Sequence, residues 1–209
     1  MSNILVIGAH YDDADLGVGG TMARLSGEGH NVYKLTITDN ETRFTQKNIL
    51  VDSKSSKDNS MEACKILGVK EVDFEPVKCN HLFYDTEIMQ RIEKVVYDLE
   101  IETAFIHFHS DMNQDHVEAS RISYTALRHC KNIFSYQSNG YLLNEAYYPR
   151  FFIDISETFE KKKKALECYG REHDRYGRLF DTVCKRNEVW GYCVEKEAAE
   201  GFEVLKMQY

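Results

Sequence analysis

Short apolar runs alternate with amphipathic segments along the first two thirds of the chain. Residues 3–9, 31–38 and 103–107 are largely apolar and rich in β-branched residues, a pattern typical of strands covered on both faces of a parallel sheet. Residues 86–99 repeat apolar side chains every three or four positions, which predicts an amphipathic helix. The other elements expected here are helices at 21–28, 60–67 and 117–130 and a short strand at 72–74, with a long polar loop, or a loop containing an irregular helix, at 39–57. This alternation of strand and helix predicts an open α/β sheet.

The last third of the chain has a different pattern, in which strands are more frequent than helices. We expect strands at 132–137, 140–142, 151–155 and 190–194 and a helix at 159–169. No internal repeat, low-complexity tract or proline-rich linker divides the sequence. The chain is therefore predicted to form a single domain over residues 1–209, with its core in residues 1–130, while residues 131–209 complete the sheet and the ligand pocket.

Two polar segments each follow a predicted buried strand directly. The first contains His10, Asp12, Asp13 and Asp15, and the second contains His107, His109, Asp111, Asp115 and His116. In an open α/β sheet, ligands bind outside the carboxyl ends of the strands. We therefore expect both clusters of imidazoles and carboxylates at one edge of the sheet, close together in space despite their separation in sequence.

These side-chain types are the usual ligands of a catalytic zinc ion, which takes three protein ligands and one water molecule. His10 and Asp13 lie three residues apart, and His116 can complete a set of two histidines and one aspartate. Asp12, next to this set, can accept the proton of an activated water molecule. Carboxylates in such a loop also cap the following helix, and capping by Asp12 or Asp15 is an equally consistent interpretation.

Charge and cysteine usage exclude several other classes of protein. The net charge of −8, without a long basic cluster, argues against a nucleic-acid-binding face. The apolar stretch at 4–9 is far shorter than the roughly 20 residues of a membrane-spanning helix, and it lacks the features of a signal peptide. The six cysteines are irregularly spaced with no CxxC pair, so we expect reduced thiols and a cytoplasmic protein. Cys79, two residues before His81, is interpreted as a buried structural thiol.

Two further enzyme classes are disfavoured by the motifs of the chain. Gly17, Gly19 and Gly20 do not complete a GxGxxG motif, and the carboxylates before them would repel a pyrophosphate, so a nucleotide cofactor is not expected. Close packing of a helix on the sheet is the expected role of Gly19 and Gly20. The chain has no GxSxG motif, which argues against a serine hydrolase.

The two polar segments also carry a family resemblance. Residues 10–20 (HYDDADLGVGG) resemble the AHPDDAELGxGG signature of the PIG-L/LmbE-like zinc-dependent N-deacetylases, and residues 111–116 (DMNQDH) resemble their second signature, DxNxDH. The resemblance implies a Rossmann-like three-layer fold with a mostly parallel central sheet. It also implies Zn²⁺ as the cofactor and hydrolysis of N-acyl groups, usually acetyl, from amino sugars or glycoconjugates.

The matching positions imply roles for individual residues. His10, Asp13 and His116 match the zinc ligands, and Asp12 matches the general base. Asp15, Asp111 and Asp115 are expected around the ligands without touching the metal, and Glu41, Arg43 and Asn113 are expected to contact the substrate. Several positions depart from the family pattern, and two of them belong to the expected site. Asp15 replaces the usual glutamate, and Asn113 stands where other branches carry a histidine thought to assist the oxyanion.

The sequence therefore predicts a zinc-dependent hydrolase that removes an N-acetyl group from an amino sugar or from its nucleotide-linked or glycoside conjugate. Two alternatives stay open: an amide hydrolase acting on a non-sugar N-acyl conjugate, and a non-catalytic metal- or sugar-binding member of the same fold. The expected partner is a small N-acylated sugar. Members of the family that the chain resembles often assemble into homo-oligomers, and the sequence leaves the oligomeric state open. Neither a nucleic-acid partner nor a membrane span is expected.

Overall fold

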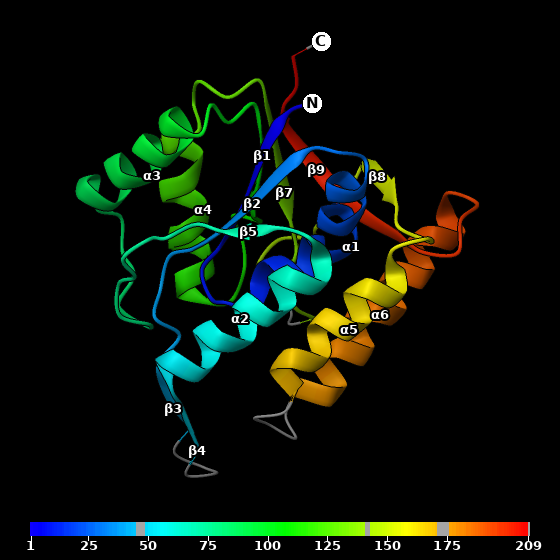
Figure 1. The fold of residues 1–209 in the computed structure, drawn as a ribbon, viewed down its shortest axis with the longest axis horizontal. Helices are drawn as coiled ribbons and strands as arrows, with labels where there is room; N and C mark the ends of the chain where they lie inside the picture. Colours follow the sequence, from blue (N-terminus) through cyan, green and yellow to red (C-terminus); the bar gives the residue numbers. More distant parts are fainter. Residues whose placement is uncertain (45–48, 141–142, 171–175, 209) are drawn as a thin grey trace.

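A seven-stranded sheet with the order β5-β2-β1-β6-β7-β9-β8 forms the centre of the computed structural model, which describes residues 1–44, 49–140, 143–170 and 176–208 (Figure 1). Its strands are β1 (Asn3–Gly8), β2 (Asn31–Thr36), β5 (Lys70–Glu71), β6 (Thr103–His107), β7 (Asn132–Tyr136), β8 (Phe151–Asp154) and β9 (Ala199–Lys206). The sheet is parallel across β1, β2, β5, β6 and β7, while β9 runs antiparallel to β7 and to β8. The predicted α/β architecture with a mostly parallel sheet is thus confirmed.

Helices lie on both sides of the sheet and make three layers (Figure 1). One side holds α1 (Asp13–Gly27), α2 (Ser53–Leu67), α5 (Phe159–Gly170) and α6 (Tyr176–Cys193), and the other holds α3 (Thr86–Asp98) and α4 (Gln114–Ala126). The side chains of β1 alternate between two apolar cores. Ile4 and Val6 pack toward α1 and α2, whereas Leu5 and Ile7 pack toward α3 and α4. Both faces of the strand are buried, which is why its sequence is apolar without alternation.

Helix α1 begins at Asp13, so the prediction of a loop through residue 20 and a helix from residue 21 is wrong. The glycine-rich segment is helical because it packs at very short range. A Cβ atom at Gly17 would lie 2.1 Å from Cδ2 of Tyr136, and one at Gly20 would lie 2.7 Å from Cδ1 of Ile155. These glycines therefore allow close approach of the helix to its neighbours, which is the role expected for the glycines of this segment.

The polar segment 39–57 contains regular structure, contrary to the predicted loop. Its elements are β3 (Thr42–Phe44) and β4 (Ile49–Val51), which pair as a separate two-stranded antiparallel sheet, and the first turn of α2. Asp52 caps α2, since its carboxylate accepts hydrogen bonds from the backbone N–H groups of Lys54 and Ser55. The first turn of α2 consists of polar residues, so hydrophobic periodicity alone did not indicate where the helix starts.

Two other predicted boundaries differ modestly from the structure. The short strand expected at 72–74 lies slightly earlier, as β5, and the helix expected at 117–130 is α4, which begins at Gln114. The earlier start matters for function, because it places Asp115 and His116 in the first turn of α4, next to the carboxyl end of β6.

The prediction of a strand at 190–194 is wrong, because most of these residues form the end of α6 and the last strand is β9. Strand β9 carries Glu200, which is fully buried and lies with its carboxylate 2.6 Å from Nζ of buried Lys162. A charged residue enters a buried strand only when its partner is also present, and that partner is distant in sequence. The strand expected at 140–142 lies mostly outside the described residues. Within the described ranges, the helices are too short or too polar to span a bilayer.

Candidate metal centre

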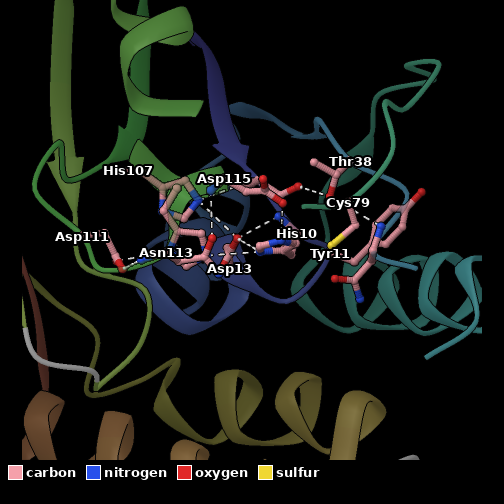
Figure 2. A network of polar contacts seen from close by, with 12 residues as sticks. His10, Tyr11, Asp13, Thr38, Cys79, His107, Asp111, Asn113 and Asp115 are labelled. Carbon is pink, nitrogen blue, oxygen red and sulfur yellow. Dashed lines mark hydrogen bonds and ion pairs between the residues drawn. The ribbon is translucent and has the colours of Figure 1, made fainter. Parts of the chain in front are cut away.

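The two polar segments meet at the carboxyl edge of the sheet, as the sequence predicted. Strand β1 leads through His10 into α1, and its neighbour β6 leads through residues 108–113 into α4. Because β1 and β6 are parallel and adjacent, the first turns of α1 and α4 lie side by side above the strand ends. Figure 2 shows the side chains of the two segments pointing toward one another.

His10, Asp13 and His116 are buried and offer one donor atom each within 4.8 Å of one another. Nδ1 of His10 lies 3.1 Å from Nε2 of His116. The two carboxylate oxygens of Asp13 lie 3.2 Å from these same two nitrogens, one each. Two ligands of a tetrahedral zinc ion, each bound at about 2.0–2.1 Å, are separated by about 3.3 Å, so the spacing fits such an ion.

The outer nitrogens of both imidazoles contact carboxylates. Nε2 of His10 is 3.2 Å from Oδ2 of Asp115, and Nδ1 of His116 is 3.1 Å from Oδ2 of Asp111. A carboxylate accepts hydrogen bonds, so in a neutral ring the proton belongs on the outer nitrogen, and the inner nitrogen presents its lone pair. Three lone-pair donors facing one another at this range repel unless a cation lies between them. The arrangement is that of metal-binding histidines oriented by carboxylates.

The two orienting carboxylates are themselves held in place. Asp115 accepts backbone hydrogen bonds from Asn80 (2.7 Å) and Leu82 (3.4 Å). Burial by itself raises the pKa of Asp115, but its hydrogen bonds with His10 and Asn80 outweigh burial and lower the pKa below its usual range. Asp111 behaves alike: burial opposes ionisation, and the contact with His116 lowers its pKa. Both groups are therefore ionised at neutral pH, and they add negative charge around the donor atoms.

The local field favours a cation at this position. Burial alone would lower the pKa of His116, but the charge of Asp13 and the hydrogen bond with Asp111 raise it to about 9. His107, buried and stacked on His116 at a centroid distance of 4.3 Å, accepts a hydrogen bond at Nε2 from the backbone N–H of Ala9. Its pKa is lowered, first by burial and then by the charge of His116, so His107 is neutral. The carboxylates, rather than His107, set the charge of the cluster.

Asp12 lines the same cavity as His10, Asp13 and His116, and its side chain does not cap a helix. It occupies the N-cap position of α1, yet its side chain makes no cap hydrogen bond. Burial and the neighbouring charge of Asp13 raise the pKa of Asp12 to about 6. Asp15 is not a cap either, because it is fully buried and pairs with Lys34. Helix capping, the alternative left open by the sequence, therefore accounts for neither carboxylate.

A cavity of about 260 Å³ opens directly above these groups. Its walls come from the loops after β1, β2, β5, β6 and β7, from α1, α4 and α6, and from β3 and β4. The lining residues are His10, Asp12, Asp13, Leu16, Asn40, Thr42, Val51, Cys79, Asn80, Asn113, His116, Asn139 and Leu179. Most of these side chains are polar, which suits a polar ligand.

Of the three residues predicted to contact the substrate, one lines the cavity and two do not. Asn113 lines the cavity, and its Oδ1 accepts a hydrogen bond from the backbone N–H of Asp115, which caps α4. Glu41 and Arg43 are exposed; among the described residues of that segment, Asn40 and Thr42 line the cavity instead. His109, the other exposed-loop candidate of the second polar segment, is 61% exposed and lies 3.4 Å from Glu145. His173, whose sequence context favours a solvated helix end over a place in the site, lies outside the described residues.

Behind the loop that carries His10 and Asp12 lies a buried ion pair that the sequence did not suggest. Lys34 in β2 contacts Asp15, and both side chains are fully buried. Nζ of Lys34 also donates to Oγ of Ser60 (2.8 Å) and to the hydroxyl of Tyr169 (2.9 Å). The Tyr169 hydroxyl in turn lies 2.9 Å from the carbonyl oxygen of Tyr11, so this network holds the backbone next to Asp12.

The sequence also missed cavity residues that follow other strands. Cys79 and Asn80 come from the loop after β5, and Asn139 follows β7. The topology of the sheet would have indicated them. Because β5 and β7 are parallel to β1, the segments that follow them lie at the same carboxyl edge of the sheet as His10. Strand β5 is only two residues long, which hid this relation. Cys79 is buried, as expected, but it also forms part of the cavity wall.

Comparison with known proteins agrees with the fold. The deacetylase YaiS of Escherichia coli K12, described as uncharacterized, is 26% identical over 170 residues, which cover 78% of this chain and 86% of YaiS. The N,N'-diacetylchitobiose deacetylase of Pyrococcus horikoshii superposes with a TM-score of 0.83 at 18% identity, covering 98% of this chain and 84% of that one.

The same fold also carries a different chemistry. GalB of Pseudomonas putida KT2440, a 4-carboxy-2-hydroxymuconate hydratase, superposes with a TM-score of 0.82 at 17% identity over 100% of this chain and 98% of its own. Structural likeness at this identity shows the fold alone. The sequence comparison is more specific, because the family model PIG-L, described as GlcNAc-PI de-N-acetylase, matches residues 5–127. Since this match covers more than half of the chain, the protein belongs to the PIG-L family.

Proposed function

We propose that the protein is a zinc-dependent N-deacetylase that removes an N-acetyl group from an amino sugar or its conjugate. The observation that carries the proposal is the convergence of His10, Asp13 and His116, with the outer ring nitrogens of both histidines against carboxylates, beside a carboxylate that makes no cap hydrogen bond. The family model and the deacetylase YaiS support the reaction class. The polar walls of the cavity support a sugar-like substrate.

His10, Asp13 and His116 would hold the metal. A bound zinc ion supplies Lewis-acid chemistry, namely polarisation of the acyl carbonyl and a lowered pKa of water. Asp111 and Asp115 fix the tautomers of the two histidines and so keep their lone pairs directed inward.

Asp12 is the proposed general base and acid. With a pKa of about 6, its carboxylate is mostly deprotonated at neutral pH and close to the value that favours proton transfer in both directions. It takes one proton from the attacking water and returns it to the nitrogen of the leaving amine. Asn113 is the proposed hydrogen-bond donor to the oxyanion: its Oδ1 is engaged in the helix cap, so Nδ2 is the atom that can donate into the cavity.

The test combines metal content and acetate release on protein purified without chelator, with N-acetylglucosamine and its nucleotide-linked form as substrates. We expect one zinc ion per chain and acetate release. Asp12→Asn is expected to retain the metal and to lower turnover by about 10²-fold or more. Asp98→Asn, which changes an exposed carboxylate paired with Lys94, is the matched control and should change neither quantity.

Two results would contradict the proposal. Metal bound without acetate release from any N-acetyl sugar would refute deacetylation of this substrate class, and would direct attention to non-sugar amides, to hydration chemistry or to a binding role. Failure to bind zinc after its addition would refute the proposed ligand set.

A further inference from the structure

His10 presents its two ring nitrogens to two different groups of donor atoms. Nδ1 faces Asp13 and His116, as described above. Nε2 faces Asp115, and Cys79 lies on the same side of the ring, away from Asp13 (Figure 2). His10, Cys79 and Asp115 are all buried, and one donor atom from each lies within 4.8 Å of the others.

An imidazole nitrogen, a thiolate and a carboxylate form a ligand set for zinc and for softer divalent ions such as Cd²⁺. We propose that His10, Cys79 and Asp115 form a second metal position for thiophilic divalent cations, which competes with the first position for His10. Metal binding at this position does not depend on the proposed function. If the protein is the proposed deacetylase, a cation at this position is expected to inhibit acetate release, and this second expectation rests on the proposed function.

The second position is preformed by backbone contacts on both of its other ligands. The Asp115 carboxylate is held by the backbone N–H groups of Asn80 and Leu82, so it stays in place without His10. The backbone N–H of Cys79 donates to Oδ1 of Asp39 at 2.9 Å, which anchors the loop that carries the thiol. Sγ of Cys79 lies 3.4 Å from Oγ1 of Thr42, a weak contact that a metal–sulfur bond would readily replace.

A cation can reach this position from solvent. Cys79 and His10 both line the cavity above the first position, so an ion that enters the cavity meets both donor sets. The second set contains the thiol, and the first contains none. A soft cation therefore favours the second set, while the nitrogen and oxygen donors of the first set suit zinc and harder ions.

Competition follows from the proton count of a neutral imidazole, which has one N–H and one lone pair. For binding at Asp13 and His116, the proton of His10 is on Nε2 and is shared with Asp115. For binding at Cys79 and Asp115, that proton moves to Nδ1, the Cys79 thiol releases its proton to solvent, and Nε2 donates its lone pair to the cation. The lone pair on Nδ1 is then lost to the first position, which retains Asp13 and His116 only.

The test uses Cd²⁺ as the probe and the ultraviolet charge-transfer band of cadmium thiolate as the readout. The background carries Cys184→Ser and Cys193→Ser, because these two cysteines are the ones that are not buried. We expect a band corresponding to one thiolate per chain, lost in Cys79→Ser and retained in Cys130→Ser, which removes a buried thiol that contacts the Ile101 carbonyl instead. Absence of the band, or its persistence in Cys79→Ser, would overturn the proposal.

Acetate release by the zinc-loaded enzyme then tests the competition. The rate of each variant with Cd²⁺ is compared with the rate of the same variant without Cd²⁺. On this scale, Cys79→Ser should need at least about 10-fold more Cd²⁺ for half inhibition than the background protein. Equal sensitivity of Cys79→Ser and the background would overturn the competition. Asp13→Asn should lose acetate release yet keep the cadmium band, which supports two distinct positions. A cadmium band in a background protein that releases no acetate would support the second position and refute the proposed function.

Discussion

Lys34 and Asp15 form a fully buried ion pair beneath the loop that carries His10 and Asp12, and replacing Lys34 by Met gives a prediction with a calculable pH dependence. The change keeps an unbranched side chain of similar length but removes the cation. Asp15 would then retain the hydroxyl of Tyr169 as a partner for Oδ2, while its Oδ1 has no hydrogen-bond partner among the described residues. Breaking a buried pair in this way costs about 3–5 kcal/mol, because one charge is left buried without compensation.

Protonation of Asp15 sets an upper limit to that cost. Keeping a carboxyl with an ordinary pKa of about 3.9 in its neutral form costs about 1.4 kcal/mol for each pH unit above that value. The limit is therefore about 4 kcal/mol at pH 7 and about 1.5 kcal/mol at pH 5. The folded variant binds a proton that its unfolded state does not, so its stability relative to wild type falls as the pH rises between these values.

Urea unfolding at pH 7 and pH 5, compared with wild type at each pH, measures this difference. The double variant Lys34→Met/Asp15→Asn has no charge to bury at this position. Its loss of unfolding free energy relative to wild type should be smaller at pH 7 than that of Lys34→Met, and it should not depend on pH. Lys54→Met removes an exposed ion pair with Asp58 and should cost less than about 1 kcal/mol. A loss below about 1 kcal/mol at pH 7 for Lys34→Met, or an equal loss at both pH values, would refute the reasoning.

Three further predictions test the site and the helix that carries it. Because the pKa of Asp12 is raised to about 6, kcat/KM for acetate release should decline as the pH falls through about 6, and a rate profile without this step would exclude Asp12 as the base. Asp111→Asn removes the charge that orients His116 and should weaken zinc binding by about 10–100-fold, measured by competition with a chelating dye; unchanged affinity would contradict the orienting role. Gly17→Ala places a Cβ atom 2.1 Å from the ring of Tyr136 and should lower the free energy of unfolding by about 1–3 kcal/mol, whereas Gly27→Ala, with no atom within 4 Å, should not destabilise the protein.

The sequence predicted the elements whose signal is local. Strands β1, β2 and β6 are buried on both faces, so their apolar runs mark them without knowledge of the fold. The place where the polar segments meet follows from topology alone, because parallel neighbouring strands end at one edge. The convergence of His10, Asp13 and His116 was therefore predictable, although their roles still await experiment.

The features that sequence reasoning missed depend on partners far away in the chain. Lys34 was part of a predicted strand, but only the structure brings it to Asp15 and Tyr169. The thiol of Cys79 was expected to be structural, because nothing local indicates that its loop reaches His10. In each case the side chain has a polar group whose environment is set by residues that are not its sequence neighbours.

The start of α1 shows why such partners also decide secondary structure. In a regular helix the N–H of Gly20 would bond to the carbonyl of Leu16. Here Nζ of Lys162 donates to the Leu16 carbonyl at 2.7 Å, and the carboxylate of Glu200 accepts from the N–H groups of Gly20 and Thr21 at 3.0 Å and 2.7 Å. The buried ion pair of Lys162 in α5 and Glu200 in β9 thus contacts the Leu16 carbonyl and the Gly20 N–H, which belong to the same helical turn. This turn directly follows the turn that carries Asp13. A glycine-rich segment with weak helix propensity is thus held as a helix by a distant ion pair, in the turn that follows Asp13.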